Sequence, residues 1–173
     1  MQDFRVSLNS TTNVFFANSE VNGTVYLKTE EPLKARKIQV SIIGRAKVAF
    51  NNLIGTTSYY YCSKIPYIEI ENVLWKSEND ENKIGAGIYE FPFKFIIPCN
   101  CPPNVSSMYG NIKYFVKGTI DVPMGFNKNF VIGFSVCPFI DLNADIRLGA
   151  PVINHMENKK MFSSKAVKAT VSY

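Results

Sequence analysis

Histidine is almost missing from this chain, and its scarcity limits the chemistry that the chain can perform. The 173 residues include one histidine, His155, which lies in a polar stretch between residues 144 and 160. Nucleophilic catalysis needs a serine or cysteine beside a base and an orienting acid, and the sequence shows no such motif. We therefore expect no enzyme and no cofactor, and a solvated His155.

Charged residues are also few, and they are not clustered. Asp, Glu, Lys and Arg make up 19% of the chain against 46% hydrophobic residues, a balance typical of a folded protein. The net charge of +5 comes from scattered basic residues, without the concentrated patch or motif that nucleic-acid binding uses. We expect no nucleic-acid partner and at most peripheral membrane contact.

Long apolar runs are absent too, because no stretch approaches the ~20 residues that span a bilayer. The first residues lack the basic and apolar segments of a secretory signal. The simplest expectation is a cytoplasmic protein, with the plasma membrane or endosomes as sites of action. Three formal glycosylation acceptors, at Asn9, Asn22 and Asn104, leave a secreted β-sandwich recognition module open as an alternative.

Cysteines number four, at positions 62, 99, 101 and 137, and a domain with a sizeable core needs no disulfides in a reducing compartment. We expect free thiols. Structural zinc sites use duplicated Cys-x2-4-Cys pairs, whereas this chain has one tighter pair, Cys99 and Cys101. We therefore expect no metal site; small buried thiols are favoured over an oxidisable pair.

The chain has, in contrast, abundant period-two alternation of apolar and polar residues. Between residues 35 and 50 the apolar residues share one parity and the polar ones take the other, which predicts a long strand with one buried face. The pattern recurs over residues 4–8, 89–97, 112–122 and 130–136. No segment keeps the spacing of an amphipathic helix.

These runs, separated by polar turns, predict an all-β fold with very little helix, built as two antiparallel sheets packed face to face. Pro92 interrupts one strand and predicts a sheet edge or a bulge there, because proline cannot donate to a ladder. We expect a sandwich domain over residues 1–148. Residues 149–173 are expected to form a linker and an isolated strand.

Several segments are familiar when they are taken in order. Residues 14–25 read VFFANSEVNGTV, and residues 41–48 read SIIGRAKV. Residues 87–98 read GIYEFPFKFIIP, residues 112–117 read IKYFVK, and residues 141–143 read DLN. Over residues 4–143 this order and spacing resembles the amino-terminal domain of the α-arrestins.

The resemblance implies an immunoglobulin-like β-sandwich, with residues from 151 onward corresponding to the start of a carboxy-terminal arrestin domain. It also implies a non-enzymatic intracellular adaptor that binds cytoplasmic parts of membrane-protein cargo for trafficking, endocytosis or signalling. A sorting subunit related to the arrestin-like component of retromer is a second alternative. α-Arrestins recruit ubiquitin ligases through Pro-Pro-x-Tyr motifs, but Asn104 and Val105 follow Pro102-Pro103, so this chain does not support ligase recruitment.

Basic residues on the parity opposite the core are the candidates for binding acidic cargo segments or anions. They are Arg5, Arg45, Lys47, Lys113 and Lys117. The alternative is that they only keep a sheet face soluble. Receptor-type arrestins carry two consecutive lysines after an aromatic in the first strand, whereas here only Arg5 follows Phe4.

Two further features keep more than one interpretation. Glu20 matches the acidic member of the buried charged cluster in receptor-type arrestins, but residues 134–139 offer no arginine partner, so we expect Glu20 to be exposed. The tyrosine run at residues 59–61 and Trp75 either pack in the core or form a recognition surface.

Overall fold

The computed structural model describes residues 3–78, 82–138, 153–159 and 166–172, and all regular structure in these ranges is β-strand. The prediction of an all-β chain is thus confirmed. The strands are β1 (Asp3–Leu8), β2 (Val14–Phe16), β3 (Glu20–Thr29), β4 (Leu33–Lys34), β5 (Lys37–Ile54), β6 (Thr57–Lys76), β7 (Lys83–Ile84), β8 (Gly87–Ile96), β9 (Val105–Ser106), β10 (Gly110–Asp121), β11 (Lys128–Cys137), β12 (Ile153–Lys159) and β13 (Ala166–Ser172).

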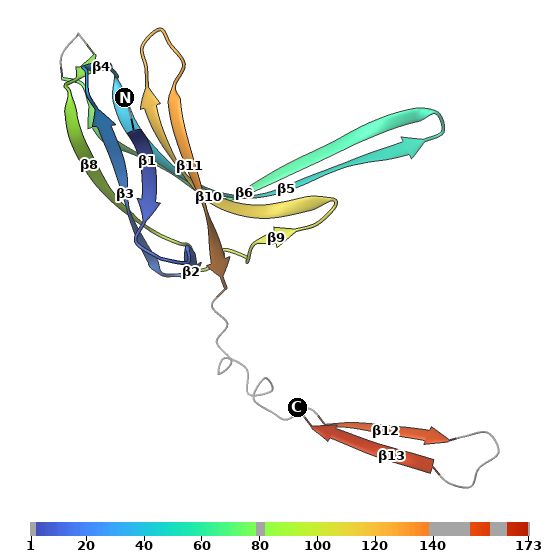
Figure 1. Cartoon of the computed structure of the whole chain (residues 1–173). Helices are drawn as coiled ribbons and strands as arrows, with labels where there is room; N and C mark the ends of the chain where they lie inside the picture. Colours follow the sequence, from blue (N-terminus) through green and yellow to red (C-terminus); the bar gives the residue numbers. More distant parts are fainter. Residues whose placement is uncertain (1–2, 79–81, 139–152, 160–165, 173) are drawn as a thin grey trace. The chain divides into compact units, whose positions relative to one another are not determined.

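The first compact unit, Met1–Phe139, contains two main sheets packed face to face, and β4 pairs with β7 in a separate two-stranded sheet (Figure 1). The small sheet has the order β1-β3-β8, and the large sheet has the order β2-β11-β10-β5-β6, with β9 added to β10. All pairings in these sheets are antiparallel except that of β2 with β11. The predicted sandwich is therefore present.

The core forms between the two sheets, where the apolar faces of their strands meet. In the large sheet Val116 lies opposite Ile42, and Ile120 lies opposite Ile38; all four side chains are fully buried. Phe134 of β11 joins this layer to the small sheet, because its ring lies 5.9 Å from that of Phe95 in β8. Burial of such side chains contributes roughly 1.5–3 kcal/mol each.

One glycine and one proline have positions in the sheets that their side chains explain. Gly44 lies opposite Tyr114, and a Cβ atom there would overlap the tyrosine ring, so only glycine lets the ring lie flat on β5. Pro92 lies on β8, which ends the small sheet among the described residues, as the missing N–H predicted.

The carboxy-terminal residues differ from the expectation of an isolated strand. Strands β12 and β13 pair with each other, Ile153 lying opposite Ser172, and they belong to a second unit, Ile140–Tyr173. His155 lies in β12 and not in a linker. The segment was mistaken for linker because its strand, INHMENK, has too few apolar residues to alternate. The predicted domain boundary at residue 148 remains a prediction.

Candidate functional site

A row of basic side chains lies on the outer face of the large sheet, on the side away from the core. Antiparallel pairing of β5 with β10 places Arg45 opposite Lys113 and Lys47 opposite Asn111. Pairing of β5 with β6 then places Lys64 opposite Lys47. We call Arg45, Lys47, Lys64, Lys113 and Lys117 the basic face.

The positive charge of this face is not neutralised within the sheet. Like charges directly opposite each other, such as Lys47 and Lys64, destabilise a strand pair. Within the described part of the chain, no carboxylate forms an ion pair with Arg45, Lys47, Lys64 or Lys113. Arg45 instead lies over the ring of Phe115, 5.4 Å from its centroid. The face therefore has the charge to attract an anion from outside.

Acidic residues flank the basic face at its end nearer the sandwich. Glu71 lies opposite Ser41, and its carboxylate is 3.7 Å from the ammonium group of Lys37. Lys117 also lies opposite Ser41, from the β10 side. Glu69 lies opposite Ile43 and lines a small pocket with Arg45 and Lys64, so acidic residues adjoin three members of the basic face.

Arg5, the remaining predicted candidate, lies apart from this row. It is on β1 in the small sheet, opposite Tyr26, whose ring centroid is 4.4 Å from its guanidinium carbon. Its guanidinium is also 3.8 Å from the carboxylate of Asp3. The five sequence candidates thus divide into four on one sheet and one, already partnered, on the other.

Lys64 is the member that the sequence pattern did not reveal. Its strand carries tyrosines on both parities at residues 59–61, so alternation does not indicate which way Lys64 points. The hairpin register would have revealed it, because Gly55 and Thr56 form the turn and Ile54 lies opposite Thr57. Counting outward from that turn pairs Lys64 with Lys47.

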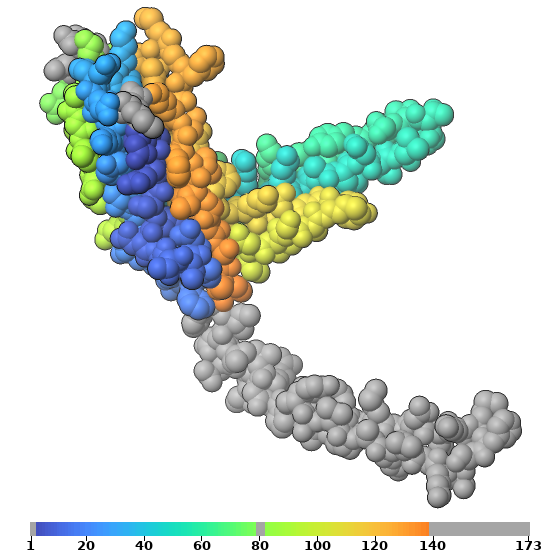
Figure 2. Space-filling view, in the orientation of Figure 1, coloured from blue at the N-terminus to red at the C-terminus, as the bar shows by residue number. Residues whose placement is uncertain are grey.

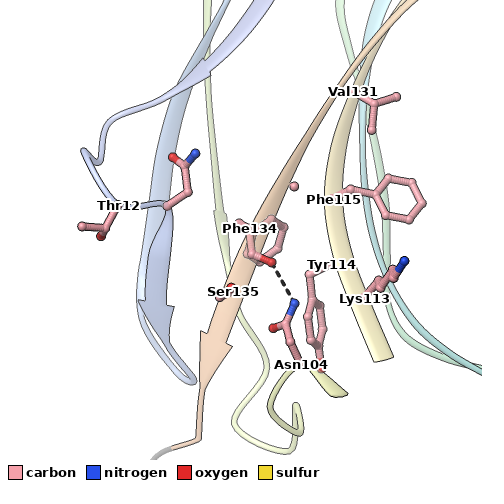
Figure 3. A pocket seen from close by; sticks show the side chains of 10 residues that line it. Thr12, Asn104, Lys113, Tyr114, Phe115, Val131, Phe134 and Ser135 are labelled. Atoms are coloured by element: carbon pink, nitrogen blue, oxygen red, sulfur yellow. Dashed lines mark hydrogen bonds between the residues drawn. The ribbon is translucent and has the colours of Figure 1, made fainter. Parts of the chain in front are cut away.

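A shallow groove of about 530 Å³ lies beside Lys113, where the large sheet splits (Figure 3). Beyond Phe134, strand β11 leaves β10 and pairs with β2, while β10 continues alongside β9. The groove is lined by Thr12, Asn13, Asn104, Lys113, Tyr114, Phe115, Val131, Gly133, Phe134 and Ser135. It combines polar donors with one ammonium group, which suits a polar or anionic extended segment.

Asn104 closes the split with its side-chain amide. Its Nδ2 donates to the carbonyl oxygen of Phe134 at 3.1 Å, the bond drawn in Figure 3. Its Oδ1 accepts from the backbone N–H of Val136 at 2.8 Å. The amide thereby satisfies the side of β11 that β10 has left. A glycan on Nδ2 would disrupt this geometry.

Tyr114 anchors the same loop from beneath. Its hydroxyl donates to the carbonyl oxygen of Pro102 at 2.7 Å, and its ring is almost fully buried. Burial raises the pKa of Tyr114, and a further rise comes from the neighbouring thiol of Cys101. Burial likewise raises the pKa of Cys101. Both groups stay protonated near neutrality and act in packing.

The other residues that the sequence singled out have structural positions without evident chemistry. Glu20 is exposed, as expected, and its carboxylate is 3.3 Å from the ammonium group of Lys94. Trp75 packs partly buried against the core. Among the described residues, no group of three or more His, Cys, Asp and Glu side chains is placed to hold a metal ion. The same ranges offer no helix with the length and apolarity to cross a bilayer.

Comparison with known proteins gives a consistent picture. Residues 4–143 match the family described as "Arrestin (or S-antigen), N-terminal domain". Similar curated proteins include arrestin domain-containing protein 17 of Caenorhabditis elegans, 26% identical over 86% of this chain and 37% of its own length. Arrestin domain-containing protein 1 of Mus musculus is 27% identical over 97% of this chain and 37% of its own length.

The chain spans less than two fifths of the length of these curated relatives. Among solved structures, the sporulation control protein Spo0M from Bacillus subtilis is similar, with a TM-score of 0.55 and 17% identity. That alignment covers 90% of this chain and 59% of Spo0M. At this identity the likeness concerns the fold alone.

Proposed function

Because the chain belongs to the arrestin N-terminal domain family, we propose that it acts as a non-enzymatic intracellular adaptor that binds cytoplasmic segments of membrane proteins. The observation that carries this proposal is the basic face, where Arg45, Lys47, Lys64 and Lys113 lie together without carboxylate partners among the described residues. The bound segment would be acidic or phosphorylated. Trafficking, endocytosis or signalling would follow from bringing this cargo to other proteins.

The strength of binding is limited by the exposure of the basic side chains. An exposed ion pair contributes about 0.2–1 kcal/mol, so four such pairs alone support only weak binding. Additional affinity would come from main-chain hydrogen bonds to an extended segment. Strand β6 ends the large sheet among the described residues and supplies an edge on which a strand could be added.

The experiment that tests the proposal measures binding of a labelled Asp- and Glu-rich peptide, and of its phosphoserine form, by fluorescence anisotropy. The double variant Arg45→Glu, Lys47→Glu should raise the dissociation constant at least about tenfold, and added salt should weaken wild-type binding because exposed charges are screened. Arg5→Glu is the matched control, since Arg5 lies in the other sheet. Equal binding by the wild type and the double variant would disprove the role of the basic face.

The secreted alternative has less structural support. It rests on three formal glycosylation acceptors, and one of them, Asn104, uses its side-chain nitrogen in a hydrogen bond to Phe134. A glycan there would remove that bond and load the groove with a bulky group. The intracellular adaptor makes no such demand on Asn104.

A further inference from the structure

The distal halves of β5 and β6 form an arm that projects from the two packed sheets (Figure 1). We call residues 46–66 the hairpin arm. The alternate residues of β5 that face the core remain mostly apolar in the arm. Among the described strands, however, no second sheet covers this face of the arm. The exposed large hydrophobic side chains on this face are Val48, Phe50, Ile54, Tyr59, Tyr61 and Ile65, and the polar Asn52, Thr57 and Ser63 lie between them.

This apolar face is ordered by contacts within the arm. The rings of Phe50 and Tyr61 stack with centroids 5.2 Å apart and an interplanar angle of 20°. At the tip, Leu53 is 70% exposed and Ile54 is 57% exposed at the end of β5, just before a turn that begins at Gly55, where φ is +63°. The arm thus presents aromatic sides and an aliphatic tip to the surroundings.

A second apolar turn lies against the base of the arm (Figure 2). The backbone N–H of Ala49 donates to the carbonyl oxygen of Tyr109 at 2.9 Å, and Gly110 pairs with Val48. Met108 is 81% exposed and Tyr109 is 60% exposed. The uncovered apolar surface therefore extends from β5 and β6 to the turn between β9 and β10.

The charge of this region has one sign only. Residues 46–68 and 91–120 contain no Asp or Glu. Lys47 and Lys64 lie opposite each other on the face of the arm that turns away from Phe50 and Tyr61. A partner must therefore accept an apolar tip, a tyrosine-rich side and adjacent ammonium groups at once.

We infer that the hairpin arm is a peripheral membrane anchor that inserts its tip into the interface of an anionic lipid bilayer. Leucine and isoleucine at the tip would enter the boundary between headgroups and acyl chains, where tyrosine rings are also favoured. The ammonium groups of Lys47 and Lys64 would remain among lipid phosphates, because long lysine stems keep their charge in water. The absence of Asp and Glu from residues 46–68 suits the negative surface of such a bilayer.

The depth of insertion is limited by the backbone of the turn. Within the described ranges, the turn at Gly55 and Thr56 and the outer edge of β6 leave peptide groups without protein partners, which hydrocarbon would penalise. Insertion is therefore confined to the outer ~5–10 Å of the bilayer. The inference does not require that the basic face binds cargo.

Cosedimentation of the full chain with vesicles tests the inference, using phosphatidylcholine alone or mixed with 30% phosphatidylserine. The wild type should bind the anionic vesicles more tightly. Leu53→Asn with Ile54→Asn should reduce partitioning at least about tenfold, through loss of burial of two aliphatic side chains. Lys47→Gln with Lys64→Gln should reduce binding to anionic vesicles by about fivefold for each lysine.

The matched control is Met124→Ser with Phe126→Ser, an equally apolar and fully exposed pair in the loop between β10 and β11. Asp121 adjoins that loop, and the variant should bind as the wild type does. A second measurement places the tip: Leu53→Trp should be quenched by brominated lipids, and Phe126→Trp should not.

Three results would overturn the inference: no wild-type binding to anionic vesicles, equal loss in the arm and control variants, or self-association through the arm in sedimentation velocity without any vesicle binding. The vesicles carry no protein, so vesicle binding does not depend on whether the acidic peptide binds. Failure of the peptide experiment would therefore leave the membrane inference standing, and failure of vesicle binding would leave the proposed adaptor function standing.

Discussion

Asn104 takes the place of a neighbouring strand for two peptide groups of β11. The carbonyl oxygen of Phe134 and the N–H of Val136 face the side that β10 has left, and both bond to the Asn104 amide. A buried peptide group without a partner costs about 1–3 kcal/mol. This one side chain therefore lets the large sheet split and creates the groove beside Lys113.

Replacing Asn104 by alanine should lower the free energy of unfolding by about 2–3 kcal/mol, because two partly buried peptide groups lose their partners. Urea denaturation followed by circular dichroism measures the change. Asn9→Ala is the control, since that asparagine is exposed, and it should alter the stability by less than about 0.5 kcal/mol. A loss of similar size in both variants would contradict the role assigned to Asn104.

The hairpin of β5 and β6 contains a pair of like charges whose repulsion lowers the free energy of unfolding. Lys47 and Lys64 lie directly opposite each other, and an opposite-charge pair there would contribute about 0.2–1 kcal/mol. Lys64→Glu should therefore raise the free energy of unfolding by up to about 1 kcal/mol while weakening binding of the acidic peptide and of anionic vesicles. Thermal denaturation and the two binding assays, run on one preparation, measure these opposite effects.

The charge-conserving variant Lys64→Arg is the control for this trade between stability and binding. It should leave the repulsion and both kinds of binding close to the wild-type level. If Lys64→Glu stabilised the chain without weakening either kind of binding, the pair would have no ligand-binding role.

The sequence predicts a single strand well where one face of that strand packs against the core. Where no core covers the strand, apolar and polar residues do not alternate and the prediction fails. Alternation over residues 35–50 predicted β5, which spans Lys37–Ile54, since Ile38 and Ile42 face the buried side. The distal half of β6 carries tyrosines on both parities, because neither side of the arm is covered by the second sheet. Lys64 was missed for this reason, and β12 because its few apolar residues do not alternate.

The assembly of strands into sheets was only partly readable from the sequence. Parity tells which face of a strand is buried but not which strand is its neighbour, so two sheets were predictable and their strand orders were not. The split beside Phe134 depends on a single amide from a loop, which no periodic pattern signals. The four basic residues of one sheet were found by parity, while the position of Arg5 in the other sheet required the topology.

Stability of the whole unit should fall in alkaline solution, because burial raises the pKa of Tyr114 above its ordinary value of 10.0 and that of Cys101 above its ordinary value of 9.0. Above about pH 9 the folded chain then binds more protons than the unfolded chain, so the free energy of unfolding decreases as pH rises. The contribution of these groups is fully present below their unfolded pKa values.

Tyr114→Phe should lower the free energy of unfolding at pH 7 by about 1 kcal/mol, because the hydrogen bond to Pro102 is lost. The variant should also show a smaller decrease in stability above pH 10. Urea titrations from pH 7 to 11 measure both effects. Ile120→Val, at a fully buried site that carries no titrating group, should lower the whole curve without changing its slope. A Tyr114→Phe curve parallel to the wild type would refute the assignment.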